Sequence, residues 1–146
     1  MASLKSKLDE LRESFPQFLR DNDDLHRGKV VSYREVKSRS LEYYFLRLRD
    51  HKFDMAMGIM FHGTSRSNIA SICQNGMNDF SYFTNSLHYA MHRSEVREES
   101  SCKLVEVLVM AVIVEESDWL GQKEAKLRHP TYEYSLPLYI ITVKKD

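Results

Sequence analysis

Apolar residues near the start of the chain recur with the period of a helix. Charged residues fill the positions between them, so the segment from about residue 4 to residue 15 is predicted to form an amphipathic helix. Ser3 is a suitable N-cap, and Pro16 is expected to break the helix or to begin a new first turn. The polar residues 21–28 are typical of a loop. The apolar positions that define the helix are Leu4, Leu8, Leu11 and Phe15.

A second, longer helix is predicted over about residues 33–50, again from the spacing of its apolar and aromatic residues. We expect these side chains to pack in the core rather than to form an aromatic platform for a ligand. One side of the predicted helix carries Val36, Ser40, Tyr44 and Leu48, with Tyr43 and Leu46 beside them.

From about residue 57 the pattern changes to short apolar runs separated by turns. Residues 57–61 indicate a buried strand that ends at His62-Gly63. Residues 68–75 are predicted to form a helix, with Gly76 at the position of its C-terminal cap. A strand is predicted over residues 82–84 and a further helix near 85–93.

The C-terminal third contains the clearest strands. Residues 104–114 are almost continuously Val, Leu, Ile and Met, which favours burial on both faces. Residues 139–143 are predicted to form a terminal strand, with Pro137 confined to its entry. The polar segment 94–103 and the connection 119–128 carry no predicted element. Because helices come first and strands later, we expect an α+β domain.

Length and composition indicate one globular domain. The chain has 146 residues, and its 21 basic residues balance its 21 acidic ones. A zero net charge argues against wholesale electrostatic binding of nucleic acid. No stretch approaches the roughly 18 apolar residues that span a bilayer, so no membrane association is expected. Cys73 and Cys102 are interpreted as reduced thiols of an intracellular protein, nuclear or cytoplasmic. A local basic patch is less favoured than a solvated face of mixed charge for Arg34, Lys37, Arg39, Arg47 and Arg49.

Four segments occur in an informative order. They are FHGTSRSNIASICQNGM (61–77), YFTNSLHYA (82–90), LVEVLVMAVIV (104–114) and LPLYIITV (136–143). In this order, and in a strand–helix–strand context, they resemble the PARP-like ADP-ribosyltransferases. The resemblance covers roughly residues 57–143. It implies an ADP-ribosyltransferase-like α+β fold in which N-terminal helices pack against a small split antiparallel sheet. Residues 1–52 would then form an N-terminal helical segment of the same domain as a core over 53–146.

The resemblance also implies an NAD site. His62 matches the histidine that hydrogen-bonds a ribose hydroxyl, and Gly63 matches the glycine whose backbone meets the nicotinamide carboxamide. Tyr82 matches the tyrosine that opens the next strand of the site. The candidate catalytic residues are His62, Tyr82 and Glu133. The candidate NAD-binding residues are His62, Gly63, Thr64, Tyr82, Phe83 and Tyr89.

Several positions depart from the family pattern. The family's glutamate, which stabilises the positive charge that develops as nicotinamide leaves, falls near Lys126, with Glu124 and Glu133 on either side. A small hydroxyl residue that bonds the carboxamide is replaced by Ala90, and Arg93 lies where a second aromatic residue is expected. Tyr89 is a substitute only if its helix is rotated. The loop that normally covers NAD is reduced to the five residues from Met77 to Ser81.

Other chemical interpretations are weaker. His88 and His92 have the spacing of a two-histidine metal site, but no third ligand accompanies them, so no metal is expected. Ser65 and Ser67 are better explained as helix N-caps than as nucleophiles. Tyr132 and Tyr134 are expected to share one face of an extended segment, with Glu133 on the other.

Three functional hypotheses remain at this stage. The first is a PARP-like fold with an eroded NAD pocket, a pseudo-enzyme that binds a protein partner, or RNA, through its N-terminal helices. The second is an active NAD-dependent mono-ADP-ribosyltransferase that modifies protein or nucleic acid. The third is a related NAD-using RNA-phosphate transferase, for which only Arg66 and Arg93 offer basic residues. The pattern of residues does not choose an oligomeric state.

Overall fold

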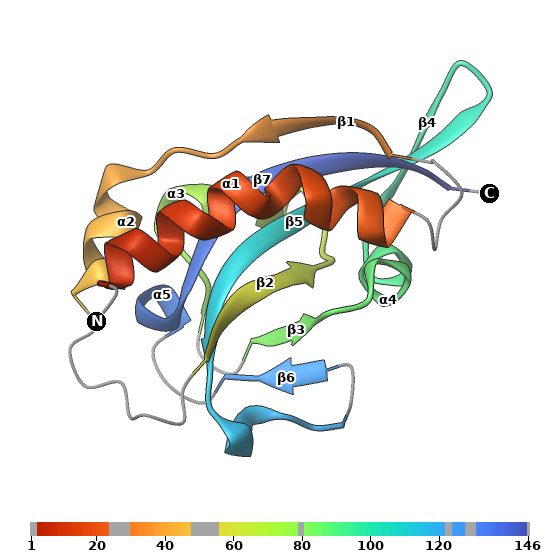
Figure 1. Ribbon diagram of the computed structural model, residues 1–146. Helices are drawn as coiled ribbons and strands as arrows, with labels where there is room; N and C mark the ends of the chain where they lie inside the picture. Colours follow the sequence, from red (N-terminus) through yellow and green to blue (C-terminus); the bar gives the residue numbers. More distant parts are fainter. Residues whose placement is uncertain are drawn as a thin grey trace.

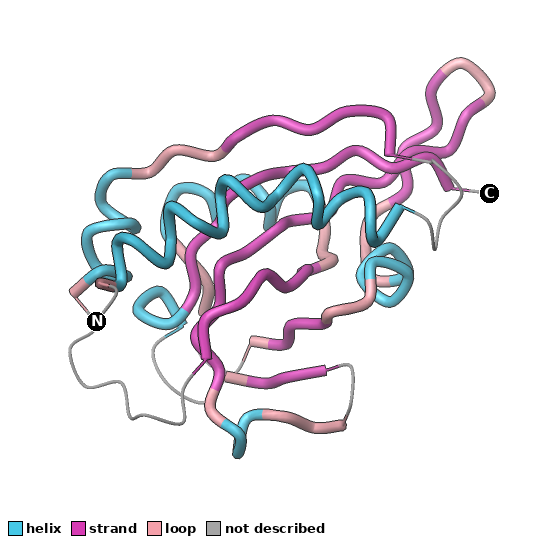
Figure 2. The backbone as a smooth tube through the Cα atoms, viewed as in Figure 1, coloured by secondary structure: helices cyan, strands magenta, loops and turns pink. Residues whose placement is uncertain are grey.

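A single antiparallel sheet forms the middle layer of the molecule (Figures 1 and 2). The computed structural model describes residues 3–23, 30–47, 56–78, 81–121, 124–127 and 131–145. Within them the strand order is β1-β7-β5-β2-β3-β6, and β4 pairs with β5 outside this path. The strands are β1 (Val30–Glu35), β2 (Ala56–His62), β3 (Tyr82–Thr84), β4 (Val96–Glu99), β5 (Cys102–Val114), β6 (Glu124–Lys126) and β7 (Ser135–Lys145).

Helices cover both faces of this sheet. In Figure 1, α1 crosses the front of the sheet and α3 lies behind it. The helices are α1 (Leu4–Asp23), α2 (Arg39–Leu46), α3 (Arg66–Asn75), α4 (Leu87–His92) and α5 (Thr131–Tyr134), with a short three-ten turn η2 (Glu116–Asp118). The expected α+β class is therefore confirmed. No helix in the described part of the chain is long and apolar enough to cross a membrane.

Strand β5 lies at the centre of the sheet and is buried on both faces, as its apolar run predicts. It pairs with β2 on one side and with β7 on the other. Alternate side chains point to opposite faces of a strand. Val107 and Val109 therefore pack with α1 and α4, whereas Leu108 and Met110 pack with α3.

Helix α1 is longer than predicted and continues through Pro16. A proline inside a helix removes one backbone hydrogen bond and strains the preceding turn. Burial of the apolar face offsets this cost, because Phe15 and Leu19 lie one turn apart and both pack on the sheet. The phenyl ring of Phe15 stacks on Tyr139, with ring centroids 3.9 Å apart and an interplanar angle of 6°. The predicted break at Pro16 is wrong. Residues 21–23 of the predicted loop belong to α1, and residues 24–28 lie outside the described part of the chain.

The helix predicted over 33–50 is also wrong in its first third. Residues 30–35 form β1, which pairs with β7 and includes a register shift between Val30 and Ser32. The β-branched and aromatic residues of this segment suit a strand, and pairing with β7 satisfies its backbone. Helix α2 begins only at Arg39, where the Ser38 hydroxyl accepts a hydrogen bond from the Leu41 N–H. Leu48 and Arg49 lie outside the described residues.

Two expectations about tyrosines are corrected by the packing. Tyr43 and Tyr44 do not enter the core: they are 55% and 48% exposed, because Leu41 and Phe45 occupy the buried face of α2. Tyr132 lies in the short helix α5 rather than in an extended segment, and its ring contacts Tyr44 edge-on. A four-residue helix offers too few positions for a periodic pattern to reveal.

The other predicted helices and strands are confirmed, but β7 begins at Ser135, so Pro137 lies within the strand, opposite Met110, rather than at its entry. Helix α3 is capped by the Ser65 hydroxyl, which accepts from the Asn68 N–H at 3.3 Å, and it ends at Gly76 with φ of 83°. Both cysteines are free thiols. In the region for which a face of mixed charge is predicted, Arg34 pairs with Glu106 and Lys37 with Glu35, in agreement with that prediction.

The packing of α1 generates a first prediction. Phe15→Ala removes a side chain that is 1% exposed and stacked on Tyr139. We expect the free energy of unfolding to fall by about 3–5 kcal/mol, as for other large-to-small core substitutions. Glu13→Ala, on the exposed side of the same helix, should change it by less than about 0.5 kcal/mol. Urea unfolding followed by circular dichroism compares the two; equal losses would contradict the assignment of Phe15 to the core.

Candidate functional site

The ends of three neighbouring strands bring the candidate residues together. His62 is the last residue of β2, and β3 pairs with β2 through Phe61 and Thr84. The imidazole Nδ1 of His62 lies 2.7 Å from the backbone oxygen of Tyr82. Strand β6 pairs with β3 on its other side and places Lys126 opposite Tyr82.

The surroundings of His62 favour its neutral form. Burial is the main cause: it lowers the pKa of His62 below the ordinary value of 6.5. The hydrogen bond to the Tyr82 carbonyl opposes this shift, and the nearby Arg93 guanidinium reinforces it. A carbonyl oxygen only accepts, so Nδ1 carries the proton and donates it to Tyr82. The other ring nitrogen, Nε2, is therefore left as an acceptor.

Gly63 is required by close packing against α4. A Cβ atom at this position would lie 1.8 Å from the backbone oxygen of Ala90 and 2.9 Å from the Oγ of Ser94. The Ala90 oxygen is itself occupied, because it accepts from the Ser94 hydroxyl at 2.8 Å and from the Arg93 N–H at 3.1 Å. The turn after β2 is thus wedged against the end of α4.

Thr64 also has structural partners. Its hydroxyl accepts a hydrogen bond from the Asn68 side chain at 3.0 Å, in the first turn of α3. Its backbone oxygen accepts from the Glu95 N–H at 3.3 Å. Thr64 therefore joins the start of α3 to the segment that follows α4.

Positive charge surrounds the ring of Tyr82. The guanidinium carbon of Arg93 lies 5.7 Å from the ring centroid, and the Nζ of Lys126 lies 5.0 Å from it. Both distances are in the range of cation–π contacts. Arg93 also forms an ion pair with Glu124 at 3.0 Å, with both side chains partly exposed. Screening by water makes such a pair worth little to stability, but it positions the arginine beside Tyr82.

The cavity between these residues is very small, with a volume of about 10 Å³. That is roughly the space of one water molecule, whereas ligand pockets are usually about 300–1,000 Å³. The residues that line it are Phe61, His62, Gly63, Tyr82, Phe83, Thr84, Tyr89, Ala90, Arg93 and Glu124.

Most of the residues proposed from the sequence therefore meet at one place. Gly63, Phe83 and Tyr89 line the small cavity together with His62 and Tyr82, and Thr64 is adjacent in sequence. Glu133 is not among the lining residues; it belongs to α5, which packs against α2 and β7. The acidic residue that lines the cavity is instead Glu124.

The role of Glu124 was not assigned from the sequence because β6 has only three residues. An apolar–polar pattern over three positions is too short to predict a strand, and the register that sets Glu124 opposite Thr84 arises only from pairing with β3. The sequence shows that residue 93 is an arginine, but it does not predict that Arg93 forms an ion pair with Glu124.

The two histidines of α4 approach each other closely. The Nε2 atoms of His88 and His92 are 3.0 Å apart, and both side chains are exposed. Among the described residues no group of three or more His, Cys, Asp or Glu side chains is arranged to hold a metal ion.

The comparison with known structures concerns the fold. The chain is similar to the crystal structure of the TASOR pseudo-PARP domain, with a TM-score of 0.58 over 91% of this chain and 94% of that chain, at 10% sequence identity. No protein-family model matches the chain, and no curated protein is found as a sequence relative. At this identity the likeness establishes a PARP-like fold, with its N-terminal helices and antiparallel sheet, and leaves the activity open.

The packing at Gly63 predicts that substitution by alanine destabilises the protein more at Gly63, in the turn after β2, than at Gly58, within β2. Gly63→Ala forces a methyl group into the Ala90 carbonyl and should lower the free energy of unfolding by about 1–3 kcal/mol or more. Gly58→Ala is the matched control, because a Cβ atom there meets nothing within 4 Å. Thermal unfolding monitored by calorimetry would compare them; a Gly63→Ala protein as stable as Gly58→Ala would contradict the close contact.

The lowered pKa of His62 predicts a pH dependence. Between the folded and unfolded pKa values the folded chain binds fewer protons at this position, so the contribution of His62 to stability is present above about pH 6.5 and is lost as the pH falls below it. His62→Asn keeps a donor for the Tyr82 carbonyl but does not titrate. We expect the wild type to lose more stability than this variant between about pH 7.5 and pH 5. Parallel urea titrations would test it, and identical pH profiles would refute it.

Proposed function

We propose that this chain is a PARP-like domain that no longer uses NAD and acts as a pseudo-enzyme interaction module for a protein partner. The observation that carries the proposal is the small cavity at the ends of β2 and β3, about 10 Å³ in volume. A dinucleotide would need a space many times larger, so the residues that line this cavity do not fit the cofactor as they stand.

The charges beside Tyr82 support the same proposal. Breaking the bond to nicotinamide develops positive charge on the ribose, which an enzyme stabilises with a carboxylate. Here Arg93 and Lys126 present two positive charges to this place, and the carboxylate of Glu124 is engaged by Arg93. Like charges at such distances raise the energy of a cationic transition state.

The backbone of the site supports it as well. In the PARP-like family that the sequence resembles, the carboxamide of nicotinamide bonds backbone groups at the position of Gly63 and a hydroxyl at the position of Ala90. In this chain the side chain at that position is the methyl group of Ala90, 0% exposed, and the Ala90 carbonyl packs directly against Gly63. A ligand group that finds no partner on desolvation loses about 1–3 kcal/mol.

An active mono-ADP-ribosyltransferase is the second candidate. It is favoured by the neutral imidazole of His62, whose Nε2 can accept from a ribose hydroxyl, next to Tyr82 and Glu124. A role as an RNA-phosphate transferase has less support. Its two candidate cations are already paired with carboxylates of this chain, Arg66 with Glu106 at 3.4 Å and Arg93 with Glu124 at 3.0 Å.

Calorimetric titration with NAD, or with a nonhydrolysable analogue, tests the proposal. We expect no binding, or binding with a Kd in the range of about 1 mM or weaker, because the cavity must open and Arg93 must leave before the ligand enters. His62→Ala should then behave like the wild type. Micromolar binding that disappears in His62→Ala would contradict the proposal, and labelled NAD with cell extract would then separate a transferase from an NAD-binding protein.

A further inference from the structure

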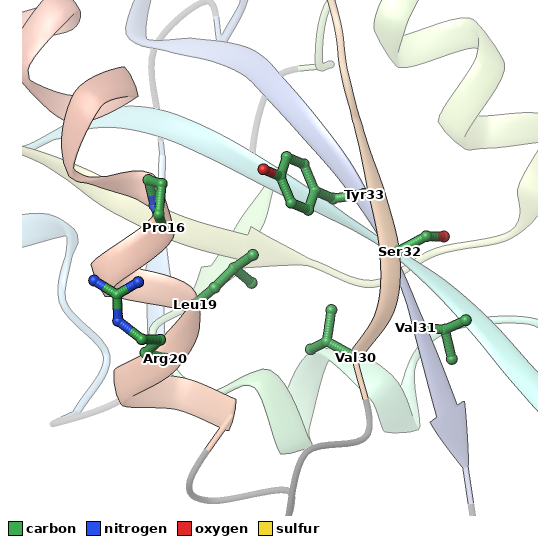
Figure 3. Close-up of a pocket in the computed structure, with 7 residues that line it drawn as sticks. All are labelled: Pro16, Leu19, Arg20, Val30, Val31, Ser32 and Tyr33. Atoms are coloured by element: carbon green, nitrogen blue, oxygen red, sulfur yellow. The ribbon is translucent and has the colours of Figure 1, made fainter.

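A groove between α1 and β1 is an apolar feature of the described surface that lies away from the small cavity at His62. Its volume is about 520 Å³. Figure 3 shows Leu19 of α1 and Val30 of β1 pointing toward each other across it, with Tyr33 above them and Arg20 at its side. Pro16 forms the remaining wall on the helix.

Strand β1 is a border of the sheet. It pairs with β7 along one side only, and no other strand of the described chain lies along its outer side. In Figure 1 it forms the upper edge of the sheet. An edge of this kind presents backbone groups that an added strand can use.

The hydrogen bonding identifies which residues face outward. The Val36 N–H donates to the Leu138 oxygen at 2.8 Å, in the same register that sets Arg34 opposite Ile140. In an antiparallel pair, bonded and non-bonded positions alternate. The N–H and C=O groups of Tyr33 and Glu35 therefore point away from β7, toward the open border.

This border lacks two common protections against strand addition, proline and lysine, although it carries the charged residues Arg34 and Glu35. Residues 30–35 contain neither Pro nor Lys, and Val31 and Tyr33 are 60% and 52% exposed. The register shift between Val30 and Ser32 interrupts the regular strand geometry at one end of β1. An added strand would therefore pair only with the part of β1 that follows this shift.

The positive charge of Arg20 indicates which polar group a ligand in the groove would carry. The Arg20 guanidinium donates to the neutral side chain of Gln17 at 2.6 Å, and no carboxylate of the described residues pairs with it. An acidic side chain placed at this end of the groove would therefore meet the guanidinium of Arg20, which is exposed on α1.

We propose that an extended segment of a partner protein adds to the outer side of β1 as a further strand. One of its apolar side chains enters the groove between Leu19 and Val30, and a carboxylate meets Arg20. This proposal rests on the proposed function, because it names the kind of partner that the interaction module would bind.

The probe is a fluorescein-labelled nonapeptide in which Val and Thr alternate around a central Leu, with Glu near both ends so that either strand direction brings a carboxylate to Arg20. Fluorescence anisotropy with the full chain should give saturable binding in the micromolar range. A peptide in which two Thr residues are replaced by Pro should not bind, because it cannot form the ladder.

Two variants at one position isolate the backbone contact. Glu35→Pro removes an outward N–H without removing a bond to β7, whereas Glu35→Ala keeps that N–H and loses the same side chain. We expect Glu35→Pro to weaken binding at least about tenfold and Glu35→Ala to leave it nearly unchanged. Equal affinities for the two variants would overturn the proposal, as would absence of binding by the wild type.

A charge reversal provides a second, independent measurement. Arg20→Glu should weaken binding of the Glu peptide by about fivefold and favour a peptide with Lys in place of Glu. Lys7→Glu is the control, because it makes the same change of charge on an exposed part of α1 away from the groove. No difference between Arg20→Glu and Lys7→Glu would refute the assigned position of the carboxylate.

Two outcomes separate this inference from the function on which it rests. If the chain forms a dimer that Glu35→Pro dissociates, measured by light scattering, the occupant is a second copy and the partner strand is disproved. NAD binding, measured on the same samples, would contradict the pseudo-enzyme role while leaving the peptide result intact, because β1 and β2 are separated by β7 and β5.

Discussion

Burial of β5 on both faces is the constraint on which the rest of the molecule depends. Eight consecutive residues, Val107 to Val114, are at most 6% exposed, so the sheet must be covered by helices on both sides. Helix α1 covers one side through Phe15 and Leu19, and α3 covers the other through Ile69 and Ile72. The two outer ends of the sheet, β1 and β3–β6, are then the places where polar chemistry or a partner can be accommodated.

At the β3–β6 end, residues that suggest an NAD site are engaged in holding the fold. Gly63 permits α4 to approach the turn after β2, Thr64 ties that turn to α3, and His62 donates to the Tyr82 carbonyl. Arg93 and Lys126 occupy the surroundings of Tyr82. Residues of this pattern can therefore be needed for packing alone, which is why the motif by itself does not establish an activity.

At the β1 end the situation is reversed. The sequence there carries no motif, yet the structure turns backbone groups of Tyr33 and Glu35 away from β7 beside an apolar groove. Because the two ends lie at opposite borders of the sheet, an interaction at β1 requires nothing from the pocket near His62. The two proposals, one for each end of the sheet, can therefore be tested independently of each other.

The sequence by itself determined the elements with long or well-punctuated patterns: the continuous apolar run of β5, the α1 periodicity, and α3 between Ser65 and Gly76. It also predicted the α+β class and that His62, Gly63 and Tyr82 lie close together. It did not determine β1, β6 or α5, nor the exposure of Tyr43 and the position of Glu124. Those features depend on pairing with β7 and β3 and on which helix face meets the sheet, and such contacts join residues far apart in the chain, where local patterns carry no information.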